Sequence, residues 1–150
     1  MHRRRAWVRD DVGSAALEFI TVGVILLVPL VYLVIVLGAI QEQAFGVEAA
    51  ARHTARAIAT APDTEAAGGR SDAVLGSIID EYRLESADVR VSIECTPVGT
   101  GCPAAGATVI VTVATRVRLP FVPAIFGLDD ALAVPVEASA AQKVSRMWGG

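Results

Sequence analysis

The chain has few of the residues on which enzyme active sites usually depend. Its 150 residues include two histidines, His2 and His53, two cysteines, and a single lysine, Lys143. No serine lies in a nucleophile motif, no glycine-rich phosphate loop precedes a helical pattern, and no His, Cys or carboxylate cluster has metal-ligand spacing. His53 lies between Arg52 and Arg56 and is interpreted as a solvated helix-face residue. We therefore expect a non-enzyme with no catalytic residue, no metal and no cofactor.

Charge is also scarce, at 19% of residues, and the net charge is −3. The distribution is uneven, because residues 1–13 carry four arginines and two aspartates while residues 14–150 have a net charge of −5. A mildly acidic surface argues against nucleic acid as a partner. With 53% apolar residues, the composition predicts one modest folded core beside a membrane anchor.

One long segment has no charge at all. Phe19 to Ile40 comprises 22 residues, which as a helix extend about 33 Å and can cross a hydrocarbon core of about 30 Å. Arginines precede this segment, at Arg3, Arg4, Arg5 and Arg9. The positive-inside rule then places residues 1–13 in the cytoplasm as a leader, and everything beyond Ile40 outside it. The sequence predicts a single-pass protein of the cytoplasmic (inner) membrane, in contact with membrane lipid.

The helical pattern continues beyond the span. Gln41 to Ala61 is rich in alanine, and Glu48 and Arg52 have the favourable i, i+4 order. We expect one transmembrane and extended helix over residues 14–61, with a kink or local loosening at Pro29.

Residues 62–71 resemble a linker, because a proline opens the segment and paired glycines lie near its end. Residues 72–150 are expected to form a small extracytoplasmic α+β domain. Its helix begins with Ser71 or Asp72 as the cap and continues to about Leu84. The apolar positions of this helix recur at i, i+3, i+4 spacing, at Val74, Leu75, Ile78, Ile79 and Tyr82.

Three segments alternate between apolar and polar residues, which predicts a three-stranded antiparallel sheet. They are 89–95, 109–117 and 132–138, and Pro135 favours an edge position for the third. Cys95 and Cys102 lie between the first two strands. In an oxidising compartment they would form a disulfide at the tip of the hairpin. Two free thiols are the alternative. A metal site is the weakest interpretation, because too few other ligands are available.

The N-terminal part of the chain resembles the type IV pilin superfamily, and more closely the TadE/TadF-type pseudopilins of the tight-adherence pilus. The resemblance depends on Gly13 followed by Glu18 and Phe19, on the span directly after them, and on the alanine-arginine run at 49–57. It covers residues 1–60 well and the remainder in outline.

The resemblance implies that a prepilin peptidase cuts after Gly13, leaving Ser14 as the mature N-terminus and Glu18 as mature residue five. Glu18, beside Phe19, would then set the assembly register by meeting the N-terminal amine of a neighbouring subunit. The chain is longer than the major Flp pilin, which implies a minor pilin, pseudopilin or assembly factor. Its implied partners are other pilin-like subunits, namely the major Flp pilin and a second pseudopilin, together with the peptidase. The implied process is cell adhesion.

Two alternatives remain at the level of sequence. Glu18 could simply lie at the membrane interface and extend toward the headgroups. The whole chain could instead be a signal-anchored or secreted binding domain unrelated to pili, with Ala44-Phe45-Gly46 as a signal-peptidase site. The mature N-terminus discriminates a pilin-like subunit from a signal-anchored or secreted domain, since it would be Ser14, Met1 or Val47.

Overall fold

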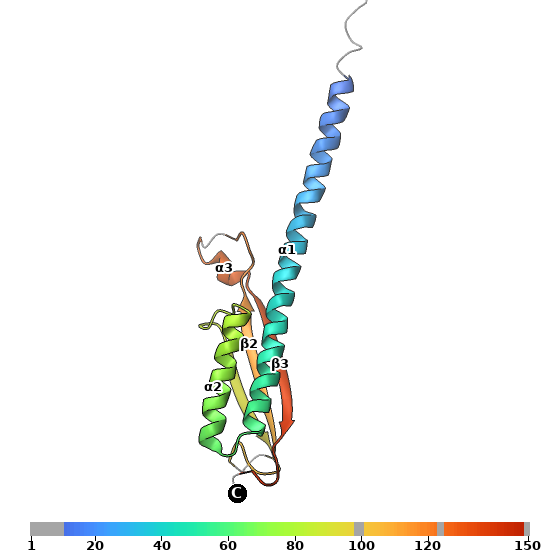
Figure 1. Ribbon diagram of the computed structural model, residues 1–150. Helices are drawn as coiled ribbons and strands as arrows, with labels where there is room; N and C mark the ends of the chain where they lie inside the picture. Colours follow the sequence, from blue (N-terminus) through green and yellow to red (C-terminus); the bar gives the residue numbers. More distant parts are fainter. Residues whose placement is uncertain (1–10, 98–100, 123–124, 149–150) are drawn as a thin grey trace, which may run out of the picture. The chain divides into compact units, whose positions relative to one another are not determined.

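The computed structural model describes residues 11–97, 101–122 and 125–148, with only the backbone described at 11–14, 128 and 129. The arginines of the predicted leader lie outside this range. The chain divides into two compact units between Leu37 and Gly38. The elements follow in the order α1 (Asp11–Ala59), α2 (Thr64–Glu81), β1 (Arg90–Thr96), β2 (Thr108–Val117), α3 (Leu128–Ala131) and β3 (Val134–Lys143) (Figure 1). The predicted α+β fold, with a long N-terminal helix and a three-stranded sheet, is confirmed.

The first unit contains the N-terminal part of α1, in which nearly every large apolar residue is exposed. From Leu17 to Leu37, all of them except half-buried Val36 are between 37% and 80% exposed, and they lie on all sides of the helix. The helix continues through Pro29 without a break in its assignment. A helix that is apolar all round, rather than along one stripe, is suited to lipid or to the interior of a helix bundle.

The second unit, Gly38–Gly150, is a helix-covered sheet. The strands are antiparallel in the order β1-β2-β3. Central β2 is paired along its whole length, with Val111 opposite Ile93 on one side and Ala140 on the other. The predicted edge position of Pro135 is confirmed, because β3 is an outer strand. β3 continues to Lys143, beyond the predicted end at Ala138.

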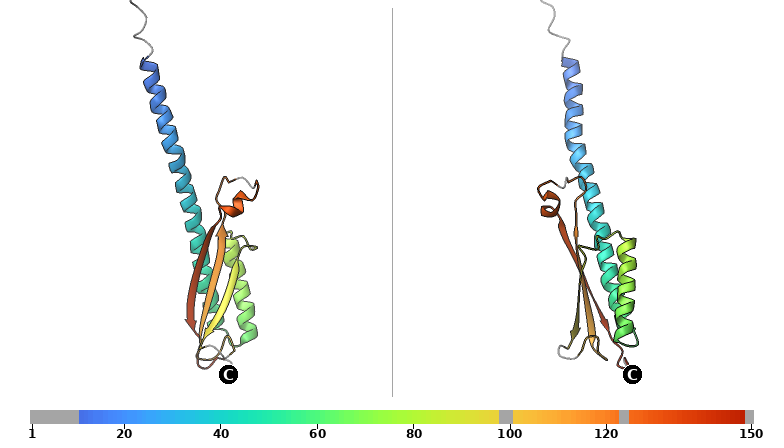
Figure 2. Two further views of the ribbon diagram at one scale, coloured as in Figure 1. Left: turned by 180° about the vertical axis from the view of Figure 1, so that it is seen from behind. Right: turned by 90° about the vertical axis from the view of Figure 1, so that its left-hand side faces the viewer.

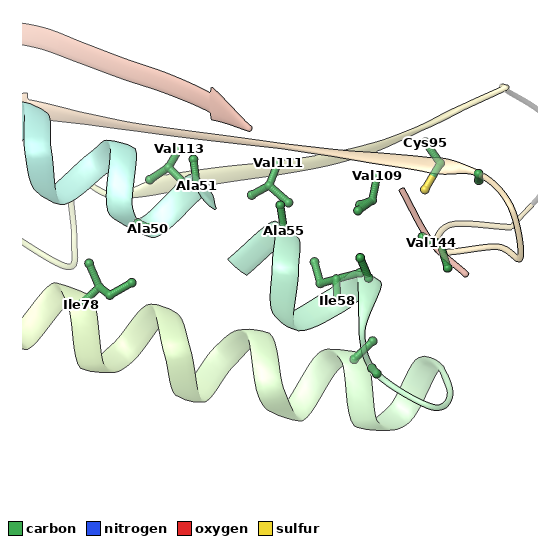
Figure 3. Close-up of a cluster of buried hydrophobic side chains, with 14 of the residues drawn as sticks. Ala50, Ala51, Ala55, Ile58, Ile78, Cys95, Val109, Val111, Val113 and Val144 are labelled. Atoms are coloured by element: carbon green, nitrogen blue, oxygen red, sulfur yellow. The ribbon is translucent and has the colours of Figure 1, made fainter. Parts of the chain in front are cut away.

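The core lies between one face of this sheet and the two helices. Figure 2 shows both helices on the same side of the sheet. Alternate residues of β2 point into this space and are buried, at Val109, Val111, Val113, Thr115 and Val117. The opposing residues of α1 are mostly small, so the helix can approach the sheet closely; Ala50, Ala51, Ala55 and Ile58 are the ones labelled in Figure 3. From α2, Ile78 completes the core.

The second helix begins earlier than the sequence pattern indicated. It starts at Thr64 rather than after Ser71, and so occupies most of the predicted linker at 62–71. Asp63 is the N-cap, since its carboxylate accepts a hydrogen bond of 2.8 Å from the backbone N–H of Ala66. This cap, together with burial of Ala67 and Ser71, outweighs the low helix propensity of the paired glycines within the first turns.

One glycine permits a close contact between the two helices. Gly46 of α1 is buried against Tyr82, the C-cap residue of α2. A Cβ atom at position 46 would lie 2.8 Å from the Cβ and 2.9 Å from the Cγ of Tyr82. Only a residue without a side chain fits in this position.

Candidate functional site

The predicted processing site lies in the first turn of α1. The backbone of Gly13 and Ser14 is helical, because the helix begins at Asp11. The first four N–H groups of a helix have no intrahelical acceptor, and terminal turns therefore open at low cost. A peptidase that requires an extended substrate could unwind this turn without disturbing the folded core, whose residues on α1 begin at Val47.

Glu18 follows one turn later and is exposed. Within the described part of the chain its carboxylate has no hydrogen-bond or ion-pair partner, whereas neighbouring Thr21 donates to the carbonyl of Leu17 at 2.7 Å. Phe19, beside it, is 80% exposed. Ser14 and Glu18 are four residues apart, so they lie on the same face of the helix. The acidic group and the predicted new N-terminus thus share one surface.

The helix that carries Glu18 is long and apolar enough to cross a membrane. An apolar N-terminal helix of this length suggests a membrane anchor or a signal sequence. The segment Ala44-Phe45-Gly46 is helical, and Gly46 is buried against Tyr82. The residues that would flank a signal-peptidase cut are therefore part of the folded second unit.

The cysteines form the predicted disulfide. Cys95 at the end of β1 is bonded to Cys102, with their Cα atoms 5.6 Å apart. The pair closes the connection toward β2, and no free cysteine is present. Thiol chemistry and cysteine-based metal binding are therefore excluded for the oxidised protein.

The hollow next to this disulfide lacks ionisable side chains. Its volume is about 230 Å³, and its wall includes Ile58, Ala67, Ser71, Ile93 and Pro103. The Ser71 hydroxyl is already engaged, since it donates to the carbonyl of Gly68 at 2.8 Å. None of the lining residues carries an ionisable side chain, so the hollow lacks a general acid or base.

Charged residues elsewhere are mostly solvated. The predicted pair forms, with Arg52 donating to Glu48, but both side chains are more than half exposed, and such pairs contribute little to stability. His53 and Arg56 are exposed on α1. Among the residues described, no group of three His, Cys, Asp or Glu side chains could hold a metal ion.

A second hollow, of about 260 Å³, lies at the other end of the sheet and is charged. Ala39, Glu42 and Gln43 of α1 meet Arg116 and Arg118 there. The β2–β3 connection begins at this point and carries exposed aromatic side chains, Phe121 and Phe126. The apolar composition of this connection between two strands is visible in the sequence, although it predicts no particular role there.

In comparisons with known proteins, no family model matches this chain, and no curated protein or solved structure shows significant similarity to it. The architecture, a long apolar N-terminal helix whose C-terminal part packs on a small antiparallel sheet, is pilin-like.

Proposed function

We propose that this protein is a minor pilin or pseudopilin, a structural or assembly subunit of a Tad-type (Flp) pilus that is stored in the cytoplasmic membrane. The observation that carries the proposal is Glu18, an exposed carboxylate without a partner in the described chain, at the start of a helix that is apolar on all sides. A charge at the edge of hydrocarbon costs free energy unless a partner neutralises it. The N-terminal amine of a neighbouring subunit is the proposed partner.

Proteolytic processing supplies that amine. Cleavage after Gly13 would remove the arginine-rich leader and create a positive charge at Ser14, one helical turn before Glu18. Two neighbouring helices offset along their axes could then pair the amine of one with the carboxylate of the other. In a low-dielectric surround, losing one member of such a pair costs about 3 kcal/mol, or roughly 100-fold in affinity per contact.

We propose no enzymatic role. The hollow beside the disulfide has no ionisable group in its wall, and the one at the other end of the sheet is lined by charges of both signs on an open surface. The partners proposed are other pilin-like subunits, the prepilin peptidase and membrane lipid, and not nucleic acid.

The intact mass of the protein purified from its host tests the processing step. The expected mass corresponds to a chain that begins at Ser14. A mass that includes Met1 would contradict the proposed cleavage. A mass that begins at Val47 would identify a signal peptide and favour a secreted domain. Replacing Gly13 with serine or a bulkier residue is expected to block cleavage.

Substitution of Glu18 tests the assembly role. Glu18→Gln keeps the size of the side chain and removes its charge, while Glu18→Ala removes both. Each variant is expected to accumulate in the membrane with the folded second unit intact, because Glu18 lies outside the core. Surface pili sheared from the cells, and co-purification with other pilin-like subunits, are expected to fall strongly.

Glu42→Gln is the matched control, since Glu42 is an exposed acid on the same helix just beyond the span. This variant is expected to assemble normally. Normal piliation in both Glu18 variants would contradict the registry role and leave Glu18 as an interfacial side chain.

A further inference from the structure

The connection between β2 and β3 exposes a group of large apolar side chains. Phe126 is 99% and Phe121 81% exposed, while Ile125 and Leu132 are 53% and 49% exposed. We refer to these four residues as the apolar loop. Single exposed apolar residues are common on protein surfaces, but a group of them on one connection usually marks an interaction site.

The backbone of the apolar loop is strained at its two most exposed residues. Phe121 and Phe126 have φ values of 64° and 57°, in the left-handed region that bulky residues rarely adopt. Strain of this kind tends to persist at functional positions. The base of the connection is held in place, because Arg118 forms ion pairs with Asp88 at 3.0 Å and with Asp130 at 3.5 Å.

The apolar loop lies at the end of the second unit where the predicted span finishes. The span ends at Ile40, and the hollow that contains Arg116 and Arg118 is lined by Ala39 and Glu42 of α1. The connection leaves the sheet directly after Arg118. Figures 1 and 2 show α3, which belongs to this connection, at the opposite end of the sheet from the C-terminal end of β3.

We propose that the apolar loop inserts into the extracytoplasmic leaflet of the membrane that α1 spans, as a second contact with lipid. The inference rests on the proposed function, which keeps α1 in the membrane. Continuity with the end of the span selects lipid as the occupant, since Glu42, Arg116 and Arg118 then lie at the height of the polar headgroups. The insertion is shallow, because irregular backbone is not tolerated in the hydrocarbon core but is hydrated at the interface.

An environment-sensitive fluorophore attached to an introduced cysteine tests the proposal. Both native cysteines are in the disulfide, so Phe126→Cys provides one reactive thiol, and removing an almost fully exposed ring leaves the core intact. Met147→Cys is the control, at an 88% exposed side chain just beyond β3, near the other end of the sheet. The full chain is reconstituted into phosphatidylcholine vesicles at no more than one copy per vesicle, which removes neighbouring subunits.

The label at position 126 is expected to show blue-shifted emission and to lose most of its fluorescence to brominated lipid, whereas the label at 147 responds only to aqueous iodide. A label at 126 that iodide quenches as efficiently as at 147 would overturn the proposal. A label shielded from both quenchers would also overturn it, because protein and not lipid would then cover the loop. Alkaline carbonate extraction distinguishes failure of the lipid contact from failure of the proposed function. If carbonate extracts the chain, α1 is not a membrane anchor, and both the proposed function and this inference fail.

Discussion

Replacing Gly46 with alanine provides a sharp test of how the two helices pack. In an exposed helix interior this change stabilises a protein by about 1 kcal/mol, since alanine has the higher helix propensity. At position 46 the new Cβ would lie 2.8 Å from the Cβ of Tyr82, closer than real contacts allow. Because this atom is the Cβ of Tyr82, whose position does not depend on the side-chain rotamer, a rotamer change cannot remove the clash.

Overpacking of this kind costs about 1–3 kcal/mol, which exceeds the gain in propensity. We expect Gly46→Ala to lower the free energy of unfolding of the second unit by about 1 kcal/mol net. Urea unfolding of the full chain in mild detergent measures this value, with the fluorescence of Trp148 as the probe because that ring packs against the core. Gly76→Ala on α2 is the matched control: apart from the adjacent residues and the local helix backbone, no atom lies within 4 Å of its added Cβ, so we expect stabilisation by up to about 1 kcal/mol.

A double-mutant cycle isolates the contact. Tyr82→Gly removes the three atoms nearest to the added Cβ at position 46, so in that background Gly46→Ala should become stabilising, by about 1 kcal/mol. The reversal of sign is the expected result. If Gly46→Ala stabilised the protein with Tyr82 in place, as Gly76→Ala does, the close approach of α1 and α2 would be refuted.

Two further predictions concern the second unit. Replacing Cys95 and Cys102 together with alanine is expected to lower the free energy of unfolding by about 2.5 kcal/mol, and thiol labelling of the unreduced, unfolded wild type should find no reactive cysteine. Asp63→Ala is expected to cost about 1 kcal/mol by removing the cap of α2, whereas Asp72→Ala, at an exposed position inside that helix, should change stability little. Equal effects of the two aspartate variants in urea unfolding would contradict the observed start of α2.

The parts of the fold that the sequence predicted are those where one physical signal dominates. β2 alternates cleanly because one of its faces is buried along the whole strand. The span is evident because charge is excluded from it, and Pro135 identified an edge strand because proline cannot donate to a ladder hydrogen bond.

The misplaced boundaries lie where two signals compete. At the start of α2 the glycine pair indicated a linker, but Asp63 caps the helix and tertiary packing of Ala67 and Ser71 retains it. β3 extends beyond Ala138 through Ser139, Ala140 and Ala141, where apolar and polar residues do not alternate clearly, although its pairing with β2 continues to Lys143. The contact between Gly46 and Tyr82 joins residues distant in sequence and has no local signature.

The candidate site was predictable only where a local property of the sequence indicates it. Glu18 stood out because a carboxylate beside an uncharged segment is costly, and its chemistry does not depend on the fold. The apolar loop was visible as composition only. Its placement at the end of the span depends on the pairing of β2 with β3 and on the ion pairs of Arg118, which are long-range features.

The two parts of α1 differ in side-chain size, and this difference bears on assembly. Large apolar residues surround the helix up to Leu37, whereas alanines dominate where it packs on the sheet. In the proposed assembly, this helix leaves lipid only if neighbouring helices cover its large apolar surface. Similar apolar side chains recur at successive turns of this segment, so ridge-into-groove packing alone allows several axial offsets. From Phe19 to Ile40 the helix has no charge. In the proposed filament, the carboxylate of Glu18 therefore selects one offset among many that would bury equal area.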